Sequence, residues 1–360
     1  MKDTEASARC RAACVDLTAG REPGPLAPVE AVALRQLLRV HALSGLGAAA
    51  LETGALRVPD RVGAGIVSDW RSAQATAAEL DRECERIGAA ALSMGAGLRA
   101  PIVLKGPAVA RRYRDPPVRT YSDIDLLVAT EEMRAWAEVL VALGYWGPPP
   151  ELAMAERRYQ EGVAFGRRAG ATQLICDLHG CVFIERRARE FTYPDLAPHS
   201  QPGPFPGLLQ PTPAAELVVL ALHLAHHDSA VVRLIWIRDF IELGQPTVVV
   251  AARELACRHD LGWALERALA AAEDVIGKPR WAASPPGRES FGLASVHQEG
   301  RTQYLRHLAL AHELGVPAAL RYFASRISPR RFPDRGTAGV WIRLAGRRMR
   351  ATRWLRWFQP

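Results

Sequence analysis

Two short apolar runs interrupt an otherwise helical pattern and narrow the choice of fold. PIVLKG (residues 101–106) and IDLLV (residues 124–128) read as buried strands, and TQLICDLHG (residues 172–180) reads as a third. PAVARRY, with Pro107 at its first position, fits a short helix, and TEEMRAWAEVLVALGY fits a longer one. Strands alternating with helices over about 80 residues predict a small sheet-containing unit, which we place at residues 99–195.

Helical periodicity dominates on both sides of this unit. Apolar residues recur at three- and four-residue steps from residue 29 to about 56 and from 61 to about 94, so residues 28–98 are predicted to form a helical region. Residues 214–320 are predicted to form a second helical domain. The expected fold class is therefore α+β, with a small mixed sheet and flanking helices embedded between N-terminal and C-terminal helical regions.

Two further segments lack a clear period. Residues 1–27 are polar, small and rich in turn formers, and we expect an irregular segment. Residues 196–213 form a proline-rich stretch, with seven prolines between residues 194 and 213, which predicts a linker or an ordered extended crossover.

The net charge of +8 is concentrated in one place. Residues 321–360 carry eleven arginines and one acid, so the other 320 residues have a net charge of −2. The arginines of this basic tail are interleaved with tryptophans, a pattern that suits an acidic partner, nucleic acid or an anionic membrane surface, or docking on the protein's own body. The sequence has no membrane-length apolar run, and we expect a cytoplasmic protein.

The most informative residues are two acids at the head of the second strand. Asp123 and Asp125 are one residue apart, so on a strand they point to the same face. Neighbouring carboxylates repel unless a cation lies between them, and Mg²⁺ prefers such oxygen ligands. Asp177, on the next predicted strand, is a third acid among apolar residues. A pair of this kind by itself more often caps a strand or borders a loop, and it is the order of strands and acids that favours a metal site.

The stretch LKGPAVARRYRDPPVRTYSDIDLLV resembles the signature of an uncharacterised bacterial nucleotidyltransferase-like family, within the DNA polymerase beta-like superfamily. The later acid-x-His strand, Asp177 to His179, and the segment HLAHHDSAVVRLIWIRDFIEL match further motifs of that family. The resemblance covers roughly residues 30–245. It implies a nucleotidyltransferase-type sheet, two Mg²⁺ ions and a nucleoside triphosphate such as ATP as co-substrate.

Carried over by this resemblance, Asp123, Asp125 and Asp177 would be the catalytic and metal-binding residues. The superfamily usually has Gly-Ser after the first strand, where the serine grips phosphate, whereas this chain has Gly106-Pro107. We therefore expect Lys105, or Arg119 and Ser122, to replace the serine, and we place Gly106 and His179 with them at the nucleotide. His179 shares a strand face with Asp177, so it could instead support a metal ligand, carry a proton, or be a satisfied polar residue beside the site.

Two groups on the C-terminal helices left alternatives open. His223, His226 and His227 lie at helical spacings, which suits either a zinc site or, preferably, core or interface histidines. Arg233, Trp236 and Asp239 share one helix face and could contact the nucleotide or, preferably, brace the helices against the sheet.

These features lead to one main hypothesis and two alternatives. The main one is a Mg²⁺-dependent transferase that moves a nucleoside monophosphate onto a hydroxyl-type acceptor of a small molecule, peptide or protein, in natural-product biosynthesis for example. An inactive nucleotide- or peptide-binding protein of the same fold is the second. The third is a toxin-like enzyme that modifies tRNA.

Overall fold

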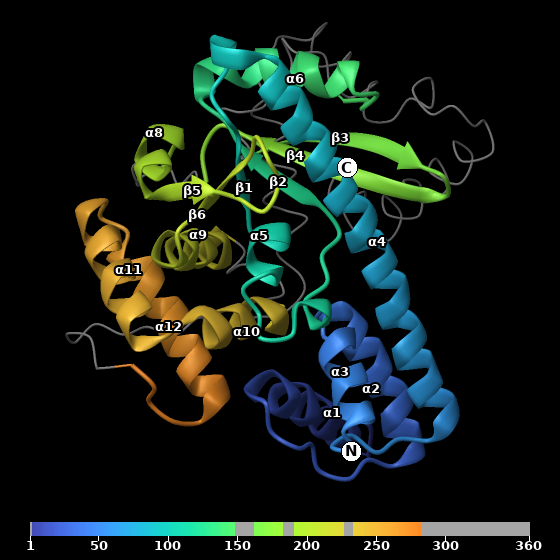
Figure 1. Ribbon diagram of the computed structural model, residues 1–360. Coiled ribbons are helices and arrows are strands. Elements are labelled where there is room, and N and C mark those ends of the chain that lie inside the picture. The colour runs from blue at the N-terminus through green and yellow to red at the C-terminus, as the bar shows by residue number, and fades with distance from the viewer. Residues whose placement is uncertain (1, 148–161, 183–190, 227–232, 282–360) are drawn as a thin grey trace, which may run out of the picture.

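The computed structural model describes residues 2–147, 162–182, 191–226 and 233–281 (Figure 1). It confirms the expected α+β class: a six-stranded mixed sheet is combined with an N-terminal and a C-terminal group of helices. The arginine-rich tail predicted at residues 321–360 lies outside the described residues.

The sheet has the strand order β3-β4-β2-β1-β6-β5. The strands are β1 (Ile102–Leu104), β2 (Ile124–Leu127), β3 (Gly162–Ala169), β4 (Thr172–His179), β5 (Ser200–Pro202) and β6 (Leu209–Pro211). The central strand β2 runs antiparallel to β1 and parallel to β4. The hairpin β3–β4 was predicted only in its second strand. β3 was missed because its sequence GVAFGRRA carries two glycines and two arginines, which weaken a strand pattern.

Successive side chains along the central strands point to opposite faces of the sheet, and both faces are buried. Ile124 and Leu126 of β2 join one hydrophobic cluster with α4 (Asp60–Ser93) and α6 (Met133–Ala142). Leu127 of β2 and Leu104 of β1 point the other way, into a cluster with the C-terminal helices. Those helices are α9 (Pro213–His226), α10 (Leu234–Leu243), α11 (Pro246–Arg258) and α12 (Gly262–Ile276). Because Asp125 lies opposite Leu104 in the register, its side chain shares the second face.

The N-terminal helices form a third cluster, below the sheet in Figure 1. The prediction that residues 1–27 are irregular was wrong, because α1 (Lys2–Ala19) is a helix. Its buried stripe at helical spacing consists of Cys10, Ala13, Cys14 and Leu17. Three of these side chains are small, so the segment looked polar and irregular in the sequence. The first predicted helical run is divided into α2 (Pro28–Val40) and α3 (Ser44–Glu52), since Ala42 between them has a φ of 56°.

The proline-rich stretch at residues 196–213 is not a free linker. It contains β5 and β6, and β6 pairs with the central strand β1 through Ile102 and Leu209. Its other alternative, an ordered extended crossover, describes it better. β5 is at the edge of the sheet. Pro202 has no backbone N–H, and at an edge this disrupts no pairing with a further strand.

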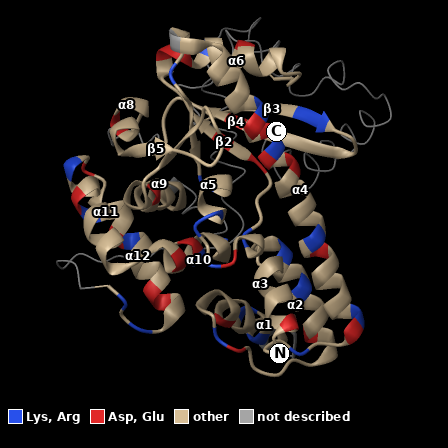
Figure 2. Ribbon diagram, in the orientation of Figure 1, with Lys and Arg blue, Asp and Glu red and all other residues tan. Residues whose placement is uncertain are grey.

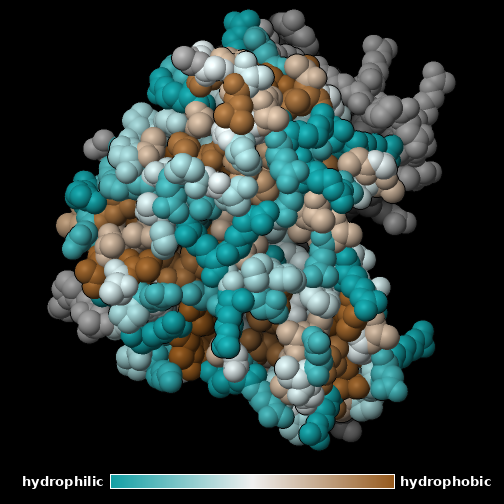
Figure 3. Space-filling model, in the orientation of Figure 1, coloured by the Kyte–Doolittle hydropathy of each residue, from teal (hydrophilic) through white to brown (hydrophobic). Residues whose placement is uncertain are grey.

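The surface of the described residues carries mixed charge. Figure 2 shows Lys and Arg interspersed with Asp and Glu along the helices rather than gathered in one stripe. In Figure 3 hydrophobic patches lie mainly over α11 and α12 and over the N-terminal helices, separated by hydrophilic side chains. None of the helices in the described ranges is both long and apolar enough to cross a lipid bilayer.

Candidate active site

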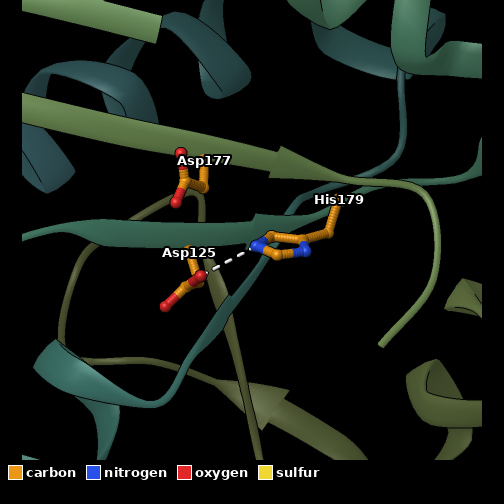
Figure 4. A group of neighbouring side chains, drawn as sticks. All are labelled: Asp125, Asp177 and His179. Atoms are coloured by element: carbon orange, nitrogen blue, oxygen red, sulfur yellow. Dashed lines mark hydrogen bonds and ion pairs between the residues drawn. The ribbon is translucent and has the colours of Figure 1, made fainter. Parts of the chain in front are cut away.

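Two parallel neighbouring strands bring the acidic residues together. Asp125 on β2 lies directly beside Asp177 on β4, and Leu127 lies beside His179. Asp177 and His179 are two residues apart on β4, so they share the face to which Asp125 belongs. Figure 4 shows the three side chains converging from the two strands.

The three side chains offer a compact set of ligand atoms. One carboxylate oxygen each from Asp125 and Asp177 and one imidazole nitrogen from His179 all lie within 4.8 Å of one another. His179 Nε2 is 2.7 Å from Asp125 Oδ1. Asp125 and His179 are buried, whereas Asp177 is partly exposed. In the described part of the chain, this is the group whose geometry could hold a metal ion.

Lys105 supplies positive charge to the same carboxylate. Its Nζ lies 3.1 Å from Asp125 Oδ1 and 3.2 Å from His223 Nδ1 on α9. An ammonium group can only donate, so His223 accepts at Nδ1. The Lys105 backbone N–H donates to Glu216 Oε1, also on α9, over 3.2 Å. Thus α9 contacts both the backbone and the side-chain ammonium of Lys105.

The backbone of Lys105 is strained. Its φ is 52° and its ψ is −125°, in a region that residues with a Cβ rarely adopt. Such a conformation costs on the order of 1–3 kcal/mol and persists where the surroundings enforce it. We attribute the strain to the turn from β1 into α5 (Gly106–Ala110), which aims the Lys105 side chain at Asp125.

The charges separate the pKa values of the two neighbouring aspartates. Burial raises the pKa of Asp125, but the Lys105 ammonium and the His179 hydrogen bond outweigh burial and hold it well below its usual range. Burial and repulsion by Asp125 raise the pKa of Asp123 to about 6. For His179, burial lowers the pKa, and the hydrogen bond to Asp125 more than offsets this and raises it.

Asp123 is close to the group but outside it. β2 begins at Ile124, so Asp123 precedes the strand on which it was predicted. Its carboxyl is partly buried and experiences the charges of Asp125, Asp177 and Lys105. The compact set of ligand atoms among the described residues contains His179 in the place where the sequence suggested Asp123.

Arg119 has a partner other than a phosphate. Its Nε and Nη2 donate to the two oxygens of Asp239 on α10 at 2.8 and 2.9 Å, and all of these groups are buried. Tyr113 Oη donates to Asp239 Oδ1 at 2.5 Å. This geometry makes Asp239 a brace between the sheet segment and α10, the preferred of its two interpretations.

Gly106 and Ser122 lie in the loops around the site. A Cβ added to Gly106 would lie 3.1 Å from Tyr121 Cβ and 3.4 Å from the Asp123 carbonyl oxygen. Gly106 therefore lets the turn after β1 approach the segment that leads into β2. Ser122 is exposed in that segment.

The contacts of Lys105 with two residues of α9 were not predicted from the sequence. Glu216 is fully buried on α9, and burial raises its pKa to about 8. His223, one of the three histidines for which a core or interface role was preferred to zinc, contacts Lys105 and packs edge-on against Trp236 at 4.6 Å. Their spacing of seven residues places both on one helix face, but it does not reveal that this face contacts Lys105. The side chain of His226 and all of His227 lie outside the described residues.

The structure places an acidic residue on β2 beside a second on the parallel strand β4, with the Lys105-Gly106 turn next to them, and these are the motifs that resembled a nucleotidyltransferase in the sequence. The chain belongs to the family described as uncharacterised nucleotidyltransferase, whose sequence model matches residues 28–275. No curated protein matches the chain.

Proposed function

We propose that this protein is a Mg²⁺-dependent nucleotidyltransferase that moves a nucleoside monophosphate from a nucleoside triphosphate to a hydroxyl-type acceptor. The observation that carries the proposal is the pairing of Asp125 with Asp177 on adjacent parallel strands, with ligand atoms within 4.8 Å. Family membership supports the same reaction class.

The donor set fits Mg²⁺. Asp125 and Asp177 provide carboxylate oxygens, the ligands that Mg²⁺ prefers, and Asp123 lies two residues before Asp125 in the chain. We assign these three aspartates as metal ligands, with His179 orienting Asp125. When bound, Mg²⁺ would neutralise phosphate charge and favour ionisation of the acceptor hydroxyl.

Lys105 is the residue that we assign to the triphosphate. Pro107 lacks a backbone N–H, and the N–H of Lys105 is taken by Glu216, so this turn is poor in backbone donors. The Lys105 ammonium stands beside the carboxylates, where it can pair with a phosphate oxygen. Ser122, exposed before β2, is a further donor to the nucleotide, and Gly106 gives the turn the room that it needs. Arg119 stays with Asp239 and contributes through the fold.

A small molecule, peptide or protein is the acceptor that we favour over a long nucleic acid. The 320 residues before the basic tail have a net charge of −2, which does not favour a polynucleotide track. The intermixed basic and acidic residues along the described helices point the same way. A role in natural-product biosynthesis would suit such an acceptor.

The test measures binding and chemistry separately. Calorimetry with Mg²⁺ and each of the four nucleoside triphosphates reports binding. Pyrophosphate release and transfer of an α-³²P label to hydroxyl-bearing peptides, small molecules and proteins report the reaction. Asp125→Asn should abolish transfer, whereas Asp69→Asn, which removes a carboxylate that pairs with Arg35 elsewhere in the fold, should not. Full transfer by the Asp125 variant would refute the assignment.

A specific observation favours one alternative, a nucleotide-binding protein without transfer. Lys105 already neutralises Asp125, and the turn that carries it lacks the usual serine. Binding of a nucleoside triphosphate in the absence of pyrophosphate release under every acceptor condition would support this alternative.

A further inference from the structure

The edge strand β3 approaches the candidate site through a glycine. Gly162, the first residue of β3, lies opposite His179 in the antiparallel register of β3 and β4. Residues directly opposite each other in such a pair place their side chains on the same face. At this position one partner is an imidazole and the other has no side chain.

The imidazole occupies the space that a side chain at position 162 would need. A Cβ added to Gly162 would lie 2.7 Å from His179 Cε1, 2.9 Å from Nδ1 and 3.0 Å from Nε2. Real Cβ atoms essentially never approach other heavy atoms more closely than about 3.0 Å, so one of the two groups must move.

The His179 ring is poorly able to move aside. It is buried, and its Nε2 is bonded to Asp125 at 2.7 Å. Displacing the ring would break that bond and change the set of ligand atoms formed by Asp125, Asp177 and His179.

Gly166, on the same strand, provides a comparison. A Cβ at Gly166 would lie 2.3 Å from the indole of Trp146, so that glycine also makes room for an aromatic ring. Its partner across the hairpin is Ile175, which is not among the candidate site residues. The two glycines therefore have the same local chemistry, and one of them faces the candidate site.

We propose that Gly162 is a positioning residue that keeps the His179 imidazole against Asp125. Its effect on nucleotidyl transfer rests on the proposed function, but its effect on the imidazole does not. A substituent at position 162 pushes the ring away from Asp125, and the Asp125 carboxylate then loses the donor that orients it.

The test is a mutational cycle with a spectroscopic readout. Gly162→Ala, His179→Ala and the double variant are compared with the wild type, and Gly166→Ala is the matched control. Long-range ¹H–¹⁵N NMR of the histidine side chains, without metal or nucleotide, reports the tautomer and hydrogen bonding of His179. Denaturant unfolding reports stability, and Mn²⁺ titration followed by EPR reports metal binding.

We expect Gly162→Ala to shift the His179 imidazole signals and to weaken Mn²⁺ binding, and Gly166→Ala to lower stability without either effect. Transfer activity should fall on the order of 100-fold, the scale of a misplacement of about 1 Å. In the His179→Ala background the clash is absent, so Gly162→Ala should cause little further loss of stability or of Mn²⁺ binding.

Three results would overturn the proposal. The first is unchanged His179 signals in a folded Gly162→Ala protein. The second is equal loss of stability from Gly162→Ala in the presence and absence of the imidazole, a comparison that remains decisive if the single variant does not fold. The third is the same His179 shift in Gly166→Ala. A complete absence of transfer in the wild type would refute the proposed function and leave the NMR and stability comparison intact.

Discussion

Lys105 Nζ lies 3.1 Å from Asp125 Oδ1, and the backbone that delivers this lysine has a φ of 52°. The contact joins a strained turn to a buried carboxylate. Since glycine would adopt that backbone conformation with little cost, a lysine at this position indicates that its side chain is used.

Two substitutions of Lys105 should distinguish its effect on the stability of the fold from its effect on nucleoside triphosphate binding. Lys105→Gly removes both the ammonium and the strain, whereas Lys105→Ala removes the ammonium and keeps the strain. We expect the glycine variant to be more stable than the alanine variant by roughly 1 kcal/mol in urea unfolding. Both variants should lose nucleoside triphosphate binding in calorimetry. Binding at wild-type affinity by either variant would contradict the assignment of Lys105 to the triphosphate.

Metal and nucleotide should stabilise the wild type together. A ligand that binds only the folded state raises stability by RT ln(1 + [L]/Kd), about 2.7 kcal/mol at 100 times Kd. We expect Mg²⁺ with a nucleoside triphosphate to raise the unfolding temperature, and EDTA to reverse the rise. Asp177→Asn should abolish the rise and Asp69→Asn should retain it. A rise that survives in the Asp177 variant would place the ligand elsewhere.

Glu216 predicts a pH dependence of stability. Burial raises its pKa from the ordinary 4.5 of a glutamate to about 8, against the opposing influence of Arg112. A raised folded-state pKa gives stability that is fully present below the unfolded pKa and is lost as pH rises through the folded one. Glu216→Gln imitates the neutral form, so its urea midpoint should increasingly exceed that of the wild type from pH 4.5 to 8. The difference can grow by at most about 1.4 kcal/mol per pH unit and should level off above pH 8.

The Glu216 comparison has a clear negative outcome. Equal pH profiles of the two proteins would show that Glu216 is ionised in the folded state across this range. Asp274→Asn is a suitable control, because Asp274 is an exposed acid on α12, whereas Glu216 is fully buried.

The Arg119–Asp239 pair should support the fold. Both side chains are buried, so Asp239→Asn leaves the Arg119 guanidinium without its charge partner, and we expect a loss of about 3–5 kcal/mol in the free energy of unfolding. Tyr113→Phe removes one hydrogen bond to Asp239 and should cost about 1 kcal/mol. At a temperature where the variants are folded, calorimetry should show nucleotide binding within a few-fold of the wild type. A selective loss of binding without loss of stability would instead place Asp239 in the nucleotide site.

The central strands were predictable because their signals are local. The apolar run of β2 and the acid at Asp125 are contiguous in the sequence, and the i, i+2 spacing of Asp177 and His179 fixes their common face. The relative placement of β2 and β4 followed from the family resemblance and not from periodicity. With these two strands in place, most of the predicted acidic group follows.

The remaining parts of the site depend on contacts between distant segments. Lys105 meets Glu216 and His223 across more than 100 residues of chain, and no spacing rule reports such a contact. Arg119 looked like a phosphate ligand because its partner, Asp239, lies 120 residues further on. Gly162 carried no signal, because the importance of a missing side chain depends on what fills the space.

Helix α4 belongs to two cores. Its first turns place Val62 and Ile66 among the N-terminal helices, and its last turns place Leu80, Cys84 and Ile87 against the sheet. With 34 residues it extends over about 50 Å, and as one continuous helix it connects the N-terminal helical core with the core beneath the sheet. A recombinant fragment that starts at residue 99 would strip three buried side chains from the sheet, so the smallest self-sufficient piece of this protein must include α4.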